Sequence, residues 1–376
     1  MLRRLGLLSV ALLPCSPALA ATAERAPAGT LPDGTVIEAV TLTGANRVSA
    51  RIISFGATLQ SLTAPDRKGE LADVLLGFDD AADYAALPSY FGVTVGRYAN
   101  RIDAGRFALD GKSYQVSVND KGNSLHGGQM GFDKRQWRIV SVTQGLQASV
   151  TLALTSADGD QGYPGRVEAQ VTYSLDDAGA LTIRFDATTD QPTVINMTNH
   201  AIFNLAGEGA PGGALGHRLT IPAAVITPVN ARLIPTGELK PVAGTAFDFR
   251  TPRTLDEGIR DGRDPQIVYA RGYDHNFALD KGLTRSPELA ARLEDPVSGR
   301  VLEVLTTDPG VQLYTGNFLD GTVIGKSGHL YRMGDGIALE PQKFPDAPNK
   351  PQFASARVDP GTPYRHVMIY RLSVAP

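Results

Sequence analysis

The distribution of glycine and proline constrains the fold of this chain more than any other feature of its sequence. The 376 residues include 40 glycines and 25 prolines, and these fall between short runs rich in Val, Ile, Thr and Leu. Helical periodicity is scarce, and it predicts only two short helices, at residues 79–87 and 287–293. Because short β-prone runs separated by turn residues are typical of sandwiches and barrels, the sequence predicts an all-β protein.

The expected strands follow one another without a long linker or an internal repeat. Asp110-Gly111 joins two of them as a hairpin turn, because this dipeptide tolerates the positive φ angles that such turns need. The glycine-rich segment 207–216 is interpreted as a loop, and residues 21–28 as a short Ala/Pro tail. We therefore predict one large antiparallel β-sandwich domain over residues 21–376, with strands at 36–42, 48–53, 107–109, 112–116, 138–142, 148–155, 166–175, 181–187, 217–221, 276–279, 301–306, 311–315 and 366–372.

The first twenty residues have the pattern of a cleavable secretory signal. Arg3 and Arg4 precede the apolar run 5–13, and Ala18-Leu19-Ala20 is a small-residue cleavage site. The apolar run is too short to span a bilayer as a mature helix. We therefore expect residues 1–20 to be a signal peptide and the mature protein to be periplasmic, with no membrane association after cleavage. Cys15, the only cysteine, would leave with the signal, so no disulfide or cysteine metal site is expected.

Charge and motif content exclude several classes of function. The net charge is −3 and charged residues are well mixed, which argues against nucleic-acid partners. The chain contains no Walker loop, no GxSxG elbow, no HExxH pair and no dinucleotide fingerprint. The acidic segment 158–165 lacks the terminal Glu of a calcium loop, so we interpret it as a turn-rich loop. No metal and no cofactor are expected.

The segment Leu339-Glu340-Pro341 carries the first candidate catalytic residue. It ends a short apolar run and precedes a loop with further prolines. Pro341 cannot donate a ladder hydrogen bond and favours an extended Glu340, so we expect the strand to end here with a rigidly held carboxylate. Rigid placement at the end of an element suits a catalytic acid or base. The alternative is a surface glutamate before a proline-rich turn.

Three histidines stand in unusual settings, His126, His200 and His275, the last just before an expected strand, and the first two are the candidates for function. His126 precedes Gly127-Gly128, where a ligand can approach the backbone closely, and His200 lies in the polar cluster 196–204. We expect His217, His329 and His366 to have surface or structural roles. Arg97 and Arg101 lie in an expected loop; for Arg97 we expect an intramolecular salt bridge.

The remaining polar residues match the chemistry of sugars. Asp274, Gln312, Arg101 and Glu340 combine acid–base groups with hydrogen-bonding partners for hydroxyl groups. Six segments together, in this order, resemble the aldose 1-epimerase (mutarotase) family: 96–102, 123–128, 196–205, 273–277, 310–318 and 339–349. The resemblance implies the large mutarotase-like sandwich, often called a supersandwich, and an isomerase that needs no cofactor.

The resemblance also implies a role for each residue. The enzyme would interconvert the α and β anomers of free aldoses, such as glucose or galactose, by opening and reclosing the ring. Glu340 would be the base at the anomeric hydroxyl and His200 the acid at the ring oxygen, which requires an ionised Glu340 and a protonated His200. His126 would bind or polarise the ring oxygen. The remaining residues would hold the sugar hydroxyls: Arg101, Asn100, Asp274 and Gln312.

Three other functions remain open on the sequence. A glycoside hydrolase would use Asp274 and Glu340 as its pair of carboxylates. A non-catalytic sugar-binding module would use the same scaffold without turnover. An epimerase of phosphorylated hexoses would need several basic residues for the phosphate. The preferred aldose and the oligomeric state are not determined by the sequence.

Overall fold

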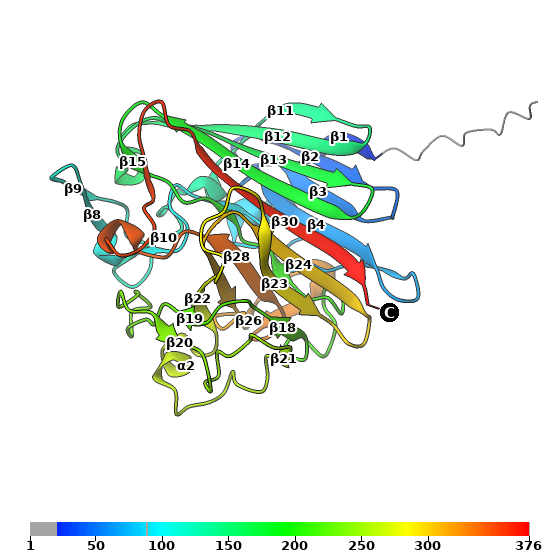
Figure 1. Cartoon of the computed structure of the whole chain (residues 1–376). Coiled ribbons are helices and arrows are strands. Elements are labelled where there is room, and N and C mark those ends of the chain that lie inside the picture. Colours follow the sequence, from blue (N-terminus) through cyan, green and yellow to red (C-terminus); the bar gives the residue numbers. More distant parts are fainter. Residues whose placement is uncertain (1–20, 88, 376) are drawn as a thin grey trace, which may run out of the picture.

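The structure is a computed structural model, which describes residues 21–87 and 89–375. The regular secondary structure of its described part consists mostly of antiparallel strands, which long loops connect (Figure 1). The predicted signal peptide, residues 1–20, lies outside the described residues. None of the described helices is long and apolar enough to cross a membrane.

A nine-stranded antiparallel sheet forms one layer of the molecule. Its longest strands alternate buried and exposed residues, as expected for a sheet with one face in the core and one in solvent. The strands, in spatial order, are β11 (Arg138–Thr143), β12 (Gln147–Ser156), β13 (Val167–Asp176), β14 (Ala180–Thr189), β30 (Tyr364–Val374), β24 (Arg300–Thr306), β23 (Glu288–Glu294), β18 (Arg218–Thr220) and β21 (Arg253–Thr254).

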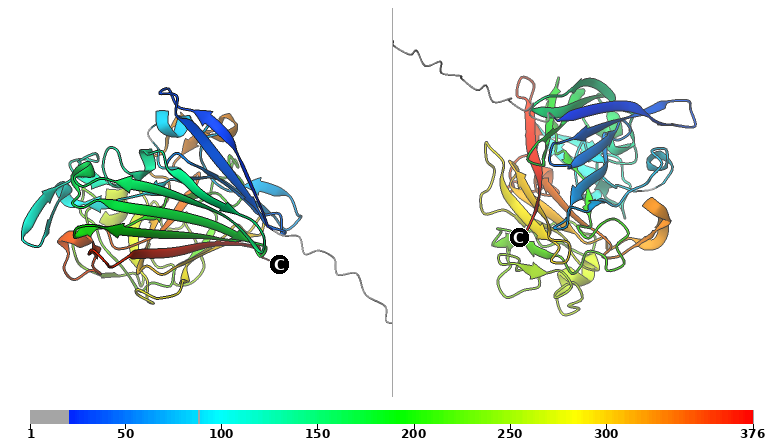
Figure 2. Two further views of the ribbon diagram at one scale, coloured as in Figure 1. Left: turned by 90° about the horizontal axis from the view of Figure 1, so that it is seen from above. Right: turned by 90° about the vertical axis from the view of Figure 1, so that its right-hand side faces the viewer.

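A five-stranded sheet covers one half of this layer. Figure 2 shows its blue strands lying across the green strands of the nine-stranded sheet. Val40 and Leu42 share a core cluster with Leu152 and Val171 of the larger sheet, so the two inner faces pack as in a sandwich. The five strands are β1 (Thr22–Thr30), β2 (Val36–Thr43), β3 (Ser49–Ile53), β4 (Thr58–Pro65) and β5 (Leu71–Asp73).

A six-stranded sheet covers the other half of the layer and carries most of the candidate residues. Phe277, Leu313 and Leu339 from one of its faces share the core cluster with Leu293 and Leu302 of the nine-stranded sheet. Its opposite face is therefore free to carry polar groups. The strands, in spatial order, are β17 (Ile202–Phe203), β28 (Ile337–Gln342), β25 (Gly310–Tyr314), β22 (Asp274–Ala278), β19 (Val225–Ile226) and β20 (Lys240–Pro241).

Short elements connect the three sheets. Five two-stranded pairs are β7 (Arg101–Ile102) with β10 (Ser124–Leu125), β6 (Thr94–Val95) with β16 (Thr198–Asn199), β15 (Thr193–Val194) with β29 (Arg357–Val358), β26 (Asp320–Ile324) with β27 (Leu330–Arg332), and β8 (Arg106–Leu109) with β9 (Lys112–Gln115). The described helices are α1 (Asp83–Ala86), α2 (Pro265–Ala270) and the 3₁₀ turns η1 (Asp103–Gly105), η2 (Phe132–Lys134), η3 (Asp160–Gly162), η4 (Lys326–Gly328) and η5 (Ala347–Asn349).

Most of the predicted elements are confirmed. The all-β fold is confirmed, and every predicted strand overlaps an observed one. The Asp110-Gly111 turn joins β8 and β9 as predicted, with both residues at positive φ. The segment 207–216 is a loop between β17 and β18. The expected helix at 79–87 is reduced to the single turn α1.

Three predictions of local structure are wrong, and tertiary pairing explains two of them. Residues 287–293 do not form a helix: strand β23 lies between β18 and β24, because its Ala290, Ala291 and Leu293 are needed in the core. Their helical propensity is outweighed by that burial. The supposed tail at 21–28 is strand β1, paired along its length with β2. Helix α2 was not predicted, although Asp264 caps its N-terminus and Pro265 begins it.

Candidate active site

A cavity of about 320 Å³ opens beside the polar face of the six-stranded sheet. This volume lies at the lower end of the range of roughly 300–1,000 Å³ that is typical of small-molecule sites. Loops from the N-terminal third of the chain close its other side. The lining residues are Ser89, Tyr90, Phe91, Asn100, Arg101, Asp120, Lys121, Leu125, His126, His200, Ile202, Asp274, Tyr314, Phe318, Leu319, Val323 and Glu340.

Glu340 reaches this cavity because of the register of three strands. Glu340 on β28 pairs with Gln312 on β25, which pairs with Asn276 on β22. Side chains alternate between the two faces of a strand, so these residues share the polar face while their neighbours enter the core. The prediction that this strand ends at Glu340 is wrong. The strand continues through Pro341 to Gln342. Glu340 is nevertheless held rigidly, with a side chain only 3% exposed.

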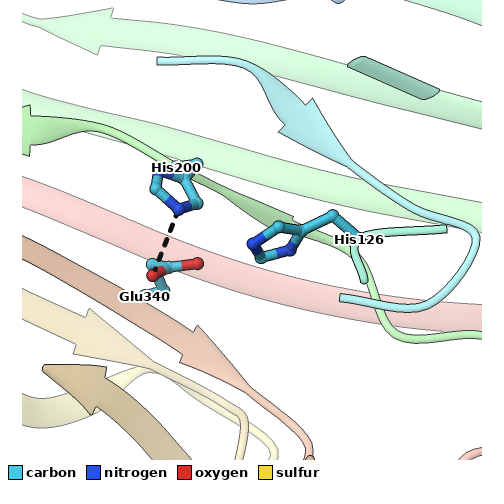
Figure 3. Close-up of side chains that lie close together, drawn as sticks. All are labelled: His126, His200 and Glu340. Carbon is cyan, nitrogen blue, oxygen red and sulfur yellow. Dashed lines mark ion pairs between the residues drawn. The ribbon is translucent and has the colours of Figure 1, made fainter. Parts of the chain in front are cut away.

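His200 faces Glu340 across the cavity (Figure 3). It lies between β16 and β17, and its backbone is fixed on both sides, donating to Val93 and accepting from Gly92 at 2.9 Å each. Its Nε2 lies 3.6 Å from Oε1 of Glu340. Among the described residues, Nδ1 of His200 and Oε2 of Glu340 have no hydrogen-bond partner. Both groups therefore have hydrogen-bonding capacity that none of the described residues uses.

His126 completes the cluster and is held in one tautomer. Its backbone N–H donates to the Asn100 carbonyl at 2.9 Å, and its Nδ1 accepts the Asn100 N–H at 3.1 Å. Because Nδ1 is an acceptor, the neutral ring carries its proton on Nε2. Gly127 permits this tight turn: its φ is +91°, and a Cβ there would collide with the Gly96 carbonyl. His126 thus presents an N–H donor at the cavity.

Burial governs the protonation of all three groups. It lowers the pKa of His200 to about 4, and it lowers the pKa of His126 well below 6.5, with the charges of His200 and Arg101 adding to the effect. It raises the pKa of Glu340 well above 4.5; the charge of Asp274 adds to this rise and that of Arg101 opposes it. Burial in the cavity therefore favours a neutral Glu340 and a neutral His200, not the ion pair expected from the sequence.

A chain of polar contacts fixes the sugar-binding candidates. Arg101 donates from Nε to Asp120 at 2.8 Å, and its Nη1 lies 3.6 Å from Asp274. Gln312 donates from Nε2 to Asp274 at 2.6 Å, and its Oε1 accepts from Gln342 at 3.1 Å. Burial raises the pKa of Asp274, an effect opposed by Arg101 and then by Gln312. Each member thus orients the next along the cavity wall.

The structure brings together six of the seven predicted site residues at the cavity. Gln312 is the exception, because it does not line the cavity. It lies behind Asp274 and donates a hydrogen bond to the Asp274 carboxylate. The six that line the cavity are Glu340, His200, His126, Arg101, Asn100 and Asp274.

Sequence reasoning missed an acid, Asp120, and four aromatic side chains of the cavity wall: Tyr90, Phe91, Tyr314 and Phe318. Asp120 stands alone in a loop, and only its partner Arg101 marks it as part of the site. The Tyr90 ring centroid lies 4.7 Å from that of His126 and 5.7 Å from that of His200. Tyr314 and Phe318 stack on each other at the open end. The position of Tyr314 could have been predicted from the sequence, because it follows Gln312 by two residues and so lies on the same face of the strand.

Arg97 does not make the salt bridge expected from the sequence. Its buried guanidinium donates to the Pro164 and Gly165 carbonyls at 2.7 and 2.8 Å and to the Ser156 hydroxyl at 2.7 Å. No carboxylate of the described residues lies within ion-pair distance of it. Burial lowers the pKa of Arg97 to about 10. Arg97 therefore fastens the loop after β12 rather than contacting the cavity.

The predicted structural histidines are confirmed where they are buried. His217 accepts the Leu205 N–H through Nε2 at 2.8 Å, and His366 bonds to Thr306 at 2.8 Å. His329 lies half exposed beside Glu208. None of the three lines the cavity.

The cavity cluster also has to be considered as a metal site. One possible ligand atom each from His126, His200 and Glu340 lies within 4.8 Å of the others. A metal needs a lone pair on each ring nitrogen that binds it. His126 offers none on Nε2, because its Nδ1 already accepts the Asn100 N–H. The cluster therefore supplies two ligands in this arrangement, which is fewer than the three of a typical catalytic zinc site.

Comparison with known proteins gives the same family for the whole chain. The sequence model described as aldose 1-epimerase matches residues 38–371. The chain is 46% identical over 330 residues to galactose mutarotase from Rattus norvegicus, covering 88% of this chain and 92% of that protein. It is 38% identical over 343 residues to aldose 1-epimerase from Escherichia coli K12, covering 90% and 96%.

Comparison with solved structures gives the same family. The crystal structure of galactose 1-epimerase from Lactobacillus acidophilus superposes with a TM-score of 0.83 at 28% identity, covering 94% of this chain and 99% of that one. Fold and cavity together define an isomerase of the mutarotase-like sandwich class. The chain belongs to the aldose 1-epimerase family, whose members interconvert the anomers of aldoses.

The hydrogen bond between Asn100 and His126 generates a testable prediction. We expect His126 to be neutral and protonated on Nε2 throughout the neutral pH range, because burial opposes its charged form. Long-range ¹⁵N–¹H NMR of histidine-labelled protein, with His126→Asn to assign the signal, would show a proton-bearing Nε2 and an unprotonated Nδ1. A ring that carries its proton on Nδ1, or one that titrates near its free pKa of about 6.5, would contradict this geometry.

Proposed function

We propose that this protein interconverts the α and β anomers of free aldoses with Glu340 as the base and His200 as the acid. The observation that carries the proposal is the buried pair itself, in which His200 Nε2 lies 3.6 Å from Glu340 Oε1 inside the cavity. Mutarotation needs one group that removes a proton from the anomeric hydroxyl and one that gives a proton to the ring oxygen. These two atoms share one carbon of the sugar, so two adjacent side chains can serve both.

The pair holds one proton in total throughout the reaction. In the state that meets the closed sugar, Glu340 is ionised and His200 is protonated. Glu340 takes the proton of the anomeric hydroxyl as His200 gives its proton to the ring oxygen, and the bond from the anomeric carbon to the ring oxygen breaks. The product is the open-chain aldehyde beside a neutral Glu340 and a neutral His200. Rotation about C1–C2 and the reverse transfers give the other anomer.

The environment of the pair favours the open-chain state. Burial is the leading cause of both pKa shifts, raising that of Glu340 and lowering that of His200, so it stabilises the neutral form of each group. Those neutral forms are the ones that accompany the aldehyde. The cavity thereby lowers the energy of the intermediate relative to the ion pair. Each correctly placed proton-transfer group contributes about 10²–10⁴-fold to such a reaction.

The other residues orient the sugar. We propose that the Nε2–H of His126 donates to the ring oxygen and that Arg101, Asn100 and Asp274 bind the hydroxyl groups; all four residues line the cavity, and the Asn100 N–H donates to Nδ1 of His126. Gln312 acts through Asp274, which it holds by a hydrogen bond. Tyr314 and Phe318 offer apolar faces to the C–H face of a pyranose. We infer that the ligand is a free monosaccharide, because the reaction requires an unsubstituted anomeric hydroxyl.

Replacing Glu340 tests the role of the base. Polarimetry of freshly dissolved α-D-galactose and α-D-glucose should show faster approach to the same final rotation with the mature protein. We expect Glu340→Gln to reduce kcat by at least about 10³-fold, since the amide cannot take the proton. Sugar binding by calorimetry should change much less, because the amide keeps the size and one acceptor of the carboxylate.

The control is Glu238→Gln, which changes an exposed carboxylate outside the cavity and should leave the rate unchanged. Loss of binding together with activity in Glu340→Gln would overturn the role of Glu340 as a base. Release of nitrophenol from a nitrophenyl galactoside would instead support a hydrolase.

We also propose that residues 1–20 direct export and that the mature enzyme works in the periplasm. The charged start, the apolar run 5–13 and Ala18-Leu19-Ala20 support this proposal. Expression of the full chain in a Gram-negative host should give periplasmic protein beginning near residue 21, as read by N-terminal sequencing. Ala18→Arg with Ala20→Arg should block processing. Cytoplasmic protein that retains Met1 or Leu2 at its N-terminus would contradict export.

A further inference from the structure

A buried carboxyl group beneath the His126 loop has no role in the chemistry described above. Asp133 lies in the 3₁₀ turn η2, is 2% exposed, and does not line the cavity. Among the described residues, neither of its carboxyl oxygens has a hydrogen-bond partner. Leaving such a group unsatisfied costs free energy, so its protonation and its neighbours need an explanation.

Three acceptor oxygens converge beside Gly131. A Cβ atom built on Gly131 would lie 2.5 Å from Asp133 Oδ1, 2.6 Å from the His126 carbonyl oxygen and 3.1 Å from the Gly96 carbonyl oxygen. The Gly96 carbonyl already accepts the Phe132 N–H at 2.9 Å. For the His126 carbonyl, no donor is found in the described part of the chain. Two unsatisfied acceptors, one carboxyl and one carbonyl, thus lie on the same side of Gly131.

Protonation of the Asp133 carboxyl group would remove the repulsion between it and the two carbonyl oxygens. An ionised carboxylate beside two carbonyl oxygens is repelled by them, whereas a carboxylic acid can donate its O–H to one. Among the charged and titratable groups, Lys134 and the Tyr90 hydroxyl interact electrostatically with Asp133. Burial raises the pKa of Asp133 to about 7, opposed first by the charge of Lys134 and then by the nearby backbone N–H of Asp133 itself. A donated hydrogen bond from the acid form would raise that pKa further.

We propose that Asp133 is a carboxylic acid whose O–H donates to the His126 carbonyl and so fixes the loop that presents the His126 ring to the sugar. Asp133 is a positioning residue in this arrangement, since it acts through His126 and touches no reacting atom. The inference rests on the proposed function only for the role of His126. The protonation of Asp133 is independent of that role.

Protonation is tested directly by ¹³C NMR of protein labelled at aspartate carboxyl carbons. The Asp133 signal is assigned by its loss in Asp133→Asn. We expect it to have the chemical shift of a carboxylic acid at about pH 6 and to begin titrating only above about pH 7, whereas free Asp titrates near pH 4. A signal that is already ionised at about pH 6 overturns the proposal, whatever the activity of the protein.

The positioning role is tested by a pair of variants measured by polarimetry with galactose. Asp133→Asn keeps the shape and a donor, so its kcat/KM at about pH 6 should stay within about threefold of that of the native protein, and at about pH 9 it should exceed the native value. Asp133→Val has no donor, so its kcat/KM at about pH 6 should fall about tenfold or more relative to that of the native protein. The exposed Asp33→Asn serves as the matched control.

Two activity results would overturn the positioning role. One is an Asp133→Asn enzyme as impaired as Asp133→Val at about pH 6, which would mean that the ionised carboxylate is needed. The other is a folded Asp133→Val enzyme with native kcat/KM. If Asp133→Val does not fold, Asp133→Asn alone decides through its two pH values. Absence of activity in the native protein would refute the proposed function and leave the ¹³C result standing.

Discussion

The cross-strand register of β28, β25 and β22 is the constraint on which the site depends. Glu340, Gln312 and Asn276 lie in one row across these strands, and the alternation of side chains sends Leu339, Leu313 and Phe277 to the opposite face. A shift of one residue would place Glu340 in the core and a leucine in the cavity. The packing of the apolar face against the nine-stranded sheet therefore also sets the position of the Glu340 carboxylate in the cavity.

The same burial that stabilises the fold sets the chemistry of the pair. Glu340 and His200 are both removed from water, which costs more for their charged forms than for their neutral forms. Only Arg101 offsets this cost for Glu340 by its charge. In the mechanism that we propose, the ion pair that meets the closed sugar is therefore the less stable arrangement, and the two proton transfers convert it to the neutral pair. The proposed mechanism uses no reactive group beyond these two side chains.

The sequence predicted which residues meet at the cavity better than it predicted local structure. Glu340, His200 and His126 could be chosen because each stands in an unusual local setting, and the structure brings the three together in one cavity. Residues 287–293 were misjudged because their helical propensity is local, whereas their pairing between β18 and β24 is not.

The cavity wall was harder to predict for a similar reason. Asp120 is recognisable only through Arg101, and Tyr90 only through the two histidine rings beside it; both partnerships join distant parts of the chain. The protonation states were also beyond the sequence. Reference pKa values of about 4.3 for Glu and about 6.5 for His predict an ionised Glu and a partly protonated His near neutral pH. Burial, with the charge of Asp274 adding to it for Glu340, favours the neutral form of both groups.

The pH dependence of kcat/KM for galactose tests most directly whether Glu340 and His200 share one working proton. Below the pKa of His200, about 4, the pair binds a second proton and no base remains; above the raised pKa of Glu340 it holds none and no acid remains. The account predicts a bell-shaped profile whose acid limb falls near pH 4. A profile that stays flat through both limbs, or an acid limb near the free imidazole value of about 6.5, would contradict it.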